Sequence, residues 1–346
     1  MTEGSLFDEI EWRDPASGRR LEPVISARTP AGVPLSGALR VEGSRTGYPI
    51  VDAVARLTPQ LAARHSAWLE PLGLEPAGAS EVPSCAFQEA GSVDSFGFQW
   101  SWNSAMRSEG DLRWRVAERF GMSEADFLGR LVLDAGAGAG DQSAWLLGRG
   151  ASVVSVDLSE AIDVVAAKLR MSSRWFGVQG DVTRLPLPER RFDVVYCEGV
   201  LQHTRNSALA VAELGRVLRP GGTLLASHYA VPTSFRGRMR FTVVESLRSG
   251  VHGWERYKLL WFAGALSVLA YVPLLGWVVR RSGLAQFHAP TPEFRTTWTN
   301  TYDALGGHTF QRHATESEFR SYFEREGGRW EILRMEANVA VARRTA

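Results

Sequence analysis

From residue 131 onward, short apolar runs of strand length alternate with segments whose apolar residues recur every three or four positions. The first pattern is typical of buried strands and the second of helices that cover a sheet. Five strands are predicted before residue 230, at 130–135, 151–159, 175–182, 191–200 and 223–229. Helices are predicted at 141–150, 159–170 and 208–222, the last ending at Pro-Gly-Gly, and two final strands at 330–337 and 338–344. This alternation indicates a mostly parallel α/β sheet with helices on both faces.

The chain before residue 131 has a different pattern and is expected to form two further parts. Residues 1–60 combine Gly, Pro, Ser and Arg with short apolar patches, which is typical of a small, irregular, β-rich module. Residues 61–130 are mostly helical in their spacing and contain an aromatic loop at 94–103. Residues 131–346 then hold the α/β domain, interrupted by an insertion at 229–325.

Composition excludes several classes of protein. With 45% hydrophobic and 22% charged residues among 346, the chain is globular rather than disordered. A net charge of +1 gives no general attraction to nucleic acid, so no nucleic-acid partner is expected. The two cysteines, Cys85 and Cys197, are too few for a disulfide framework, and the acidic N-terminus does not resemble a signal peptide. A cytoplasmic protein is therefore expected.

Three glycines follow the first predicted strand of the α/β domain, at every second position. Gly136, Gly138 and Gly140 come directly after Asp134, where the strand ends and a helix begins. Glycine is kept where a chain turns tightly or a ligand approaches the backbone, and ligands of α/β sheets bind at this edge. The negative charge of Asp134 would repel a pyrophosphate but attract an ammonium or sulfonium group. The G-x-G-x-G spacing also differs from that of dinucleotide sites, so a nicotinamide dehydrogenase is disfavoured.

Acidic residues also end the next three strands. Asp157, followed by Leu158, is placed to accept hydrogen bonds from ribose hydroxyls. Asp181, with Val182 beside it, is placed to contact an adenine amino group, and Glu198 reaches the same sheet edge. A single carboxylate of this kind is usually solvated or capping, but the ordered series indicates one nucleoside site. No metal site is expected.

These motifs resemble those of class I S-adenosylmethionine-dependent methyltransferases of the ubiquinone and menaquinone biosynthesis group. The resemblance covers residues 131–228 and rests on VLDAGAGAG, VDLSEA, GDVTRLPLPERRFDVVYCEGVLQHT and ELGRVLRPGGTLLASH. It implies a Rossmann-like sheet of seven strands with S-adenosyl-L-methionine as the cofactor. In such a domain Asp134 and the three glycines would lie beside the methionine moiety. Asp157 would lie at the ribose and Asp181 near the adenine.

Two segments outside this region carry further resemblances. Residues 96–100, FGFQW, resemble a Phe-Gly-x-x-Trp segment at the edge of the cofactor site in the same group, and a packed aromatic loop is the alternative. The N-terminal module resembles a small zinc ribbon that precedes some methyltransferases. Four other residues occupy its cysteine positions: Asp14, Ser17, Val41 and Ser44. Without thiolates a tetrahedral zinc site is lost, so the module is either a metal-free relic or an unrelated extension.

The insertion at 229–325 lies where this family usually has substrate-binding elements. It contains 21 uncharged residues, 259–279, which is long enough for a transmembrane candidate. A single span is excluded because the strands after it must return to the same sheet, and the Gly and Pro residues within it predict a broken helix. Basic residues flank this segment over 236–281. Peripheral contact with an anionic membrane, a lid over an apolar substrate and a buried helical pair all stay open.

The expected activity is transfer of a methyl group from S-adenosylmethionine to a small acceptor, apolar or lipid-like in view of the insertion. Positioning supplies much of the rate, and a base is needed where the acceptor loses a proton. His203, after the fourth strand, is the first candidate base, and His228, at the end of the fifth, is the second. His308, His313 and Tyr302 could reach from the insertion.

A second class of function is a cofactor-binding subunit or scaffold without catalytic activity. The degenerate N-terminal module is compatible with it, but the intact acidic and glycine motifs argue against it. Release of S-adenosylhomocysteine by the purified protein would separate the two. The acceptor atom (O, N or C), the pathway and the oligomeric state are not indicated by the sequence.

Overall fold

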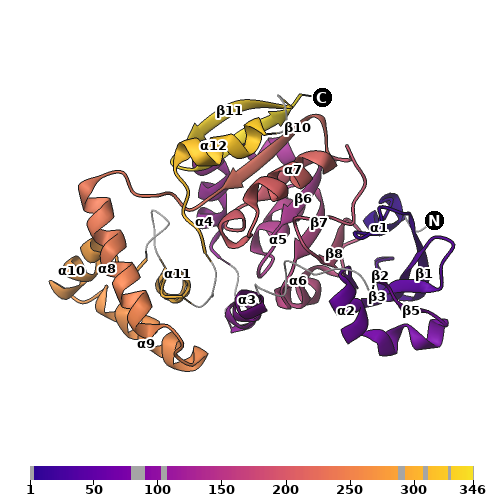
Figure 1. The fold of residues 1–346 in the computed structure, drawn as a ribbon, viewed down its shortest axis with the longest axis horizontal. Helices are drawn as coiled ribbons and strands as arrows, with labels where there is room; N and C mark the ends of the chain where they lie inside the picture. The colour runs from indigo at the N-terminus through magenta and orange to yellow at the C-terminus, as the bar shows by residue number, and fades with distance from the viewer. Residues whose placement is uncertain are drawn as a thin grey trace.

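One twisted sheet runs through the molecule and organises the other elements around it (Figure 1). The computed structural model describes residues 4–78, 90–102, 107–286, 293–306, 311–325 and 329–345. The strand order in the sheet is β1-β2-β3-β4-β8-β7-β6-β9-β10-β12-β11, and the short β5 pairs with β3. The α/β part therefore lies in the middle of a larger sheet that begins in the N-terminal module.

The seven strands expected for the α/β domain are confirmed. They are β6 (Leu131–Ala135), β7 (Ser152–Asp157), β8 (Trp175–Gln179), β9 (Phe192–Cys197), β10 (Leu218–Ser227), β11 (Trp330–Glu336) and β12 (Val339–Arg344). Strands β6 to β10 pair in parallel, whereas β12 runs antiparallel to both β10 and β11. Every residue of β6 and β8 is buried, as expected for strands covered on both faces.

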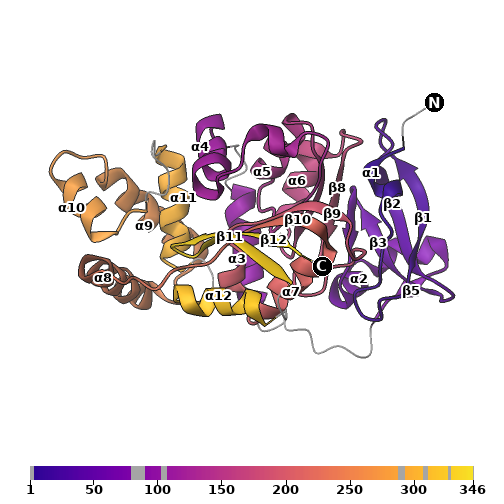
Figure 2. The same cartoon turned by 90° about the horizontal axis from the view of Figure 1, so that it is seen from above.

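Helices cover both faces of this sheet (Figure 2). On one side lie α4 (Glu109–Trp114), α5 (Asp141–Gly148) and α6 (Ala161–Leu169), and on the other α7 (Ser207–Val217) and α12 (Glu316–Glu324). Successive strands build outward from β6 to β7 and β8, and then from β9 to β10 on the other side. The order thus reverses between β6 and β9, which is where open α/β sheets bind ligands at the carboxyl ends of their strands.

Two local predictions were wrong. The segment 94–103 was expected to be a loop, but its described part belongs to α3 (Ala90–Trp102). Its aromatic residues face different neighbours, so no 3.6-residue stripe is visible: Phe96 contacts His203, Phe98 contacts Tyr257 and Trp102 contacts Trp298. The Pro-Gly-Gly stretch also does not end a helix, because α7 ends at Val217 and 220–222 lies in an irregular part of β10.

The N-terminal module adds four strands to the edge of the α/β sheet. These are β1 (Leu21–Arg28), β2 (Pro34–Val41), β3 (Thr46–Val51) and β4 (Val54–Arg56), with α1 (Leu6–Glu9), α2 (Pro59–Arg64) and β5 (Glu75–Pro76) around them. Strand β4 pairs in parallel with β8. Phe7 and Trp12 pack on Phe176 of β8 with ring centroids 4.7 and 5.4 Å apart. Apolar burial and backbone pairing therefore join the module to the α/β domain.

The four positions compared with zinc-binding cysteines make other contacts. Asp14 is buried and accepts hydrogen bonds from the Tyr48 hydroxyl (2.7 Å) and the Ser17 hydroxyl (2.5 Å). Ser44 Oγ lies 2.9 Å from Thr46 Oγ1, and Val41 is in the hydrophobic core. No group of three or more His, Cys, Asp or Glu residues that could hold a metal occurs among the described residues.

The insertion forms a helical unit at the end of the molecule opposite the N-terminal module (Figures 1 and 2). It contains α8 (Phe235–Val251), α9 (Arg256–Leu269), α10 (Leu275–Ser282) and α11 (Phe294–Ala304). The apolar stretch 259–279 is broken between α9 and α10, as expected. Across the described segments, none of the helices combines the length and apolarity needed to cross a bilayer.

A glycine permits the close contact between α9 and α11. A Cβ atom added to Gly264 would lie 2.7 Å from Cε2 of Trp298 on α11. The Trp298 indole also donates a hydrogen bond to the Leu260 carbonyl at 2.7 Å, so the ring cannot move away freely. The two helices are thereby held against each other.

Replacing Gly264 with alanine should lower the free energy of unfolding by about 1–3 kcal/mol, because an overpacked contact forces the backbone or the indole to shift. Denaturant unfolding followed by circular dichroism measures this. Gly250→Ala on α8 is the control, since nothing lies within 4 Å of its added Cβ atom. It should be neutral or slightly stabilising. Equal effects of the two substitutions would contradict this account of the α9–α11 contact.

Candidate functional site

The glycine turn after β6 adopts backbone conformations that favour glycine. Gly136, Gly138 and Gly140 have φ angles of +87°, +52° and +81°. The Gly136 N–H donates to the Val156 carbonyl at 2.7 Å, and the Gly138 N–H donates to Oδ2 of Asp157 at 2.9 Å. The turn is thus fastened to the end of β7.

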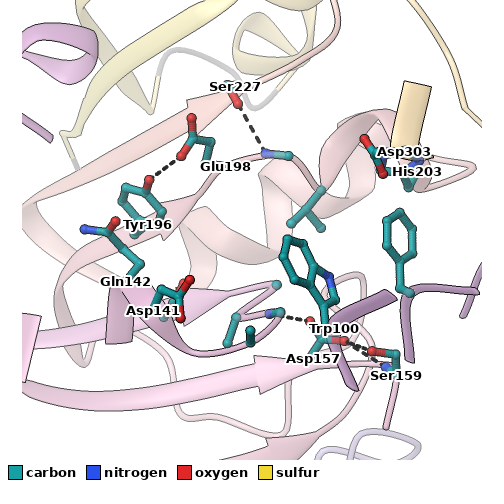
Figure 3. A pocket seen from close by; sticks show the side chains of 18 of the residues that line it. Trp100, Asp141, Gln142, Asp157, Ser159, Tyr196, Glu198, His203, Ser227 and Asp303 are labelled. Carbon is teal, nitrogen blue, oxygen red and sulfur yellow. Dashed lines mark hydrogen bonds between the residues drawn. The ribbon is translucent and has the colours of Figure 1, made fainter. Parts of the chain in front are cut away.

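A cavity of about 300 Å³ lies over the carboxyl ends of the central strands (Figure 3). Ten of the eleven predicted site residues line it: Asp134, Gly136, Gly138, Asp157, Leu158, Asp181, Val182, Glu198, His203 and His228. Gly140 is not among its lining residues. A Cβ atom there would lie 2.7 Å from Val165 of α6, so this glycine permits helix packing at the start of α5.

One side of the cavity holds buried carboxylates. Asp134 is 2% exposed and accepts a 2.5 Å hydrogen bond from Ser143. Burial is the main cause that raises the pKa of Asp134 to about 7, and the charges of nearby carboxylates add to this rise. The hydrogen bond from Ser143 acts in the opposite direction and lowers the pKa. Burial also raises the pKa of Asp157, although Ser159 and the Gly138 N–H donate to it. A positively charged ligand would be stabilised here.

Arginines from the segment before β6 line the same cavity. Arg115 and Arg119 each lie 2.9 Å from the Glu198 carboxylate, and the Tyr196 hydroxyl donates to Glu198 at 2.5 Å. Burial alone would raise the pKa of Glu198, but the two arginines lower it to about 2. Burial and Arg115 lower the pKa of Arg107, although Asp111 lies 3.9 Å from its guanidinium. The site therefore offers positive charge as well as negative charge.

Sequence reasoning missed these arginines. Arg115 and Arg119 are four residues apart, a spacing that is typical of the solvent-exposed face of a helix. Their burial depends on Glu198, which lies 79 or more residues further along the chain. Glu198, expected at the cofactor, is therefore held by protein cations in the structure.

The other end of the cavity combines aromatic rings with polar groups. His203 is 9% exposed, and its ring centroid lies 4.9 Å from that of Phe96 and 5.5 Å from that of Tyr229. The Tyr229 hydroxyl donates to Oδ2 of Asp303 at 3.0 Å. Burial is the main cause that raises the pKa of Tyr229 well above its usual value, and the negative charge of Asp303 adds to it. The phenol therefore keeps its proton. Asn300 lies on the same helix as Asp303, α11 of the insertion.

The remaining candidate histidines lie deeper or outside the cavity lining. His228 Nδ1 lies 3.1 Å from the Tyr229 carbonyl, and its ring packs near Phe319 and Tyr322 of α12. Burial lowers its pKa. Burial, and to a smaller extent the positive charge of Arg248, lower the pKa of His313 to about 4. His313 does not line the cavity. His308 lies outside the described residues, as does Cys85.

Several buried amide groups at the cavity have unused hydrogen-bonding capacity. Within the described part of the chain, no partner is found for either amide atom of Gln142, for Oε1 of Gln99 or for Nδ2 of Asn300. All three residues line the cavity. Since buried polar groups are nearly always hydrogen-bonded, a polar ligand is the expected partner. Gln142 lies two residues after the glycine turn and Gln99 lies within the segment 96–100, so both could have been chosen from the sequence, whereas Asn300 could not.

Trp100 occupies the middle of the pocket (Figure 3). In that view His203 and Asp303 lie on one side of its indole, and Glu198, Tyr196 and Gln142 lie on the other. A Cβ atom on Gly138 would lie 3.1 Å from Trp100, so the indole rests directly on the glycine turn. Phe96 and Trp100 of the predicted aromatic segment thus both reach the site, from helix α3.

Comparison with known proteins gives one family match. Residues 133–226 match the family model described as methyltransferase domain. A demethylmenaquinone methyltransferase of Clavibacter sepedonicus is 34% identical over 131 residues, which cover 38% of this chain and 53% of the relative. A ubiquinone biosynthesis O-methyltransferase of Hahella chejuensis is 34% identical over 138 residues, covering 37% of this chain and 57% of the relative.

The chain spans about half the length of the curated relatives it matches. Among solved structures, an S-adenosylmethionine-dependent methyltransferase from Mesorhizobium loti aligns with a TM-score of 0.41 at 19% identity. That alignment covers 68% of this chain and 99% of the solved one. The matched sequence region contains the glycine turn and the ends of β7, β8 and β9 described above.

Placing a side chain on the glycine turn should block the cavity. In Gly138→Val the side chain would meet Trp100, and the affinity for S-adenosylhomocysteine, measured by calorimetry, should fall at least about tenfold. Gly221→Val is the matched control: its φ of +77° imposes similar backbone strain, but nothing lies within 4 Å of its added Cβ. Binding by Gly138→Val equal to that of the parent would contradict the assignment of this turn to the cofactor.

The raised pKa of Asp134 predicts a pH-dependent stability. Because the folded protein holds this proton more tightly than the unfolded chain, the stabilisation is fully present below about pH 4 and is lost as pH rises through about 7. Asp134→Asn removes that dependence. In urea unfolding of the ligand-free proteins, the variant should gain stability relative to the parent between pH 5 and pH 8. If the difference in free energy of unfolding between the variant and the parent stays constant over this pH range, the raised pKa of Asp134 is contradicted.

Proposed function

We propose that this protein, which contains a class I S-adenosylmethionine-dependent methyltransferase domain, transfers a methyl group to a small acceptor with an apolar or aromatic body. The observation that carries this proposal is the cavity at the β6–β9 reversal, whose two ends differ in chemistry. In Figure 3, Glu198 and Gln142 lie on one side of Trp100, and His203 and Asp303 lie on the other. Arg115 and Arg119 contact Glu198, whereas Phe96 and Tyr229 lie against His203. Such a division suits a zwitterionic cofactor beside an acceptor.

The residues of the first end fit S-adenosylmethionine. Its ammonium and sulfonium charges match Asp134, whose ionised form lacks a counter-charge, and its carboxylate matches Arg107. Asp157 and Asp181 would accept hydrogen bonds from the nucleoside. Gln142, whose amide is buried without a partner in the described structure, would complete the polar contacts. When bound, the cofactor supplies a methyl group on a positively charged sulfur, which is already activated for displacement.

The acceptor end favours a ring that bears a hydroxyl or another group able to lose a proton. Phe96 and Tyr229 offer aromatic contact surfaces, and Asn300 and Asp303 offer polar ones. The Trp100 indole, in the middle of the pocket, separates this end from the other. The relatives named above are a demethylmenaquinone methyltransferase and a ubiquinone biosynthesis O-methyltransferase, so a reduced quinone or a related phenol is the acceptor class we infer. O-methylation of a phenol and C-methylation of a quinol ring both require loss of a proton from the acceptor.

The chain's own part in the reaction is positioning and proton removal. His203 lies between Phe96 and Tyr229, which fix its ring, and it is the proposed acceptor of the proton. Asp303 holds the Tyr229 hydroxyl and brings α11 to the cavity, so it positions this end of the site.

The activity can be tested directly. Purified protein with S-adenosylmethionine and reduced demethylmenaquinone, or an extract of total lipids, should yield S-adenosylhomocysteine and an acceptor heavier by one methyl group in mass spectrometry. If the protein binds the cofactor but transfers no methyl group to either the quinol or the lipid extract, the result would instead support a cofactor-binding subunit without catalytic activity.

Variants at the acceptor end should lose turnover but keep the cofactor. His203→Ala should reduce kcat by about 100-fold or more, and Asp303→Asn should also reduce it, while the affinity for S-adenosylhomocysteine stays within about twofold. His252→Ala, at an exposed histidine after α8, is the control and should match the parent. Unchanged turnover in His203→Ala would exclude this histidine as the base.

A further inference from the structure

The helical insertion exposes an unusual amount of apolar surface. Of the 21 large hydrophobic side chains that are exposed in the described structure, sixteen lie between Val231 and Phe294. Fourteen of them come from α8, α9, α10 and the turns between them, and the other two are Val231, before α8, and Phe294, at the start of α11. These helices lie at the end of the molecule away from the N-terminal module (Figure 1). Isolated exposed apolar residues are ordinary, but a concentration of them marks an interaction surface.

The surface is most apolar at the turn between α9 and α10. We call residues 271–278, with sequence YVPLLGWV, the apolar tip. Leu274 is 89% exposed, Trp277 58% and Leu275 54%, and within the tip only Gly276 is buried. Below the tip, Ala270, Val279 and Ala285 form a small core of their own. That core leaves the larger side chains of the tip in solvent.

The backbone of the tip is strained in a way that displays Leu274. Leu274 has φ +65° and ψ −55°, and the Leu275 N–H donates to the Pro273 carbonyl at 2.8 Å. This is a γ-turn with positive φ, a rare and strained conformation for a leucine. The turn is held by a tight contact, because a Cβ atom on Gly276 would lie 2.3 Å from the Ala270 carbonyl oxygen. Strain of this kind is typically retained where function requires it.

The same helices carry a large share of the positive charge. Residues 235–286 contain eight Lys or Arg and two Glu, a net charge of +6, whereas the whole chain has +1. Around the tip this charge comes from Arg280 and Arg281 on α10 and Arg240 on α8, all exposed. No ion pair among the described residues involves these three arginines. Arg281 lies over the Trp277 ring at 4.9 Å, so cation and apolar group are presented together.

We propose that the apolar tip and its arginines dock on the surface of an anionic lipid bilayer. Leu274 and Trp277 would enter the interfacial region, and the arginines would contact lipid phosphates. A second copy of the chain fits this face poorly, since a symmetric contact would bring Arg280 and Arg281 of both copies together. Helix α9 then connects the docked face to α11, which lines the catalytic cavity. The proposal does not depend on the acceptor that is methylated.

Vesicle sedimentation tests this surface. The full chain should pellet with vesicles of phosphatidylcholine and phosphatidylglycerol (3:1) at low salt, and much less with phosphatidylcholine alone. Leu274→Glu combined with Trp277→Glu, and separately Arg280→Glu combined with Arg281→Glu, should each lower the partition coefficient at least about tenfold. These side chains are exposed, so both variants should keep the parent's melting temperature.

Two controls match these changes elsewhere on the surface. Met171→Glu replaces an exposed apolar residue outside the insertion, and Arg184→Glu with Arg325→Glu makes the same change in net charge. Both should pellet like the parent. Failure of the parent to bind anionic vesicles, or equal loss in the controls, would overturn the proposal. So would a change in oligomeric state in the Leu274 and Trp277 variant by sedimentation velocity, since a second copy would then cover the tip.

Discussion

The site rests on a carboxylate that the sheet keeps away from water. Asp134 lies at the end of a fully buried strand, and its neighbours on the cavity wall include other carboxylates. A cation stabilises the ionised form of such a group, so this wall of the cavity favours a positively charged partner. The glycine turn leaves room at this end of β6, because Gly136 and Gly138 carry no side chains and the Trp100 indole rests directly on the turn. The hydrogen bond from the Gly138 N–H to the Asp157 carboxylate then connects the turn to the residue proposed to bind the nucleoside.

The cavity is completed by elements far apart in the sequence. Helix α3 contributes Trp100 and Phe96, the sheet contributes the acidic strand ends, and α11 of the insertion contributes Asn300 and Asp303. Trp298 on α11 packs against Gly264 on α9, so a displacement of the outer helices would be transmitted to the cavity. The insertion thereby closes one wall of the site and exposes its own outer face at the same time.

The α/β core could be predicted from the sequence because its strands are short, apolar and separated by regular helices. Four of the seven strands are within two residues of their predicted limits, β8 and β9 end three residues before theirs, and β10 begins five residues earlier than predicted. The acidic residues were found because each one ends a strand. The aromatic segment 94–103 was predicted wrongly, since its rings contact several different elements and leave no helical stripe. Arg115 and Asp303 depend on tertiary contacts with distant segments, and no local pattern marks them.

The parallel pairing of β4 with β8 has a consequence for how the protein can be divided. Residues 54–56 supply the hydrogen-bonding partners of β8, a strand whose side chains are all buried. A fragment that begins near residue 131 would leave β8 as a bare sheet edge, next to an uncovered Phe176. Exposed apolar edges of this kind recruit other chains and aggregate. The first sixty residues therefore cover this edge of the sheet, and we expect the α/β domain to aggregate when it is expressed without them.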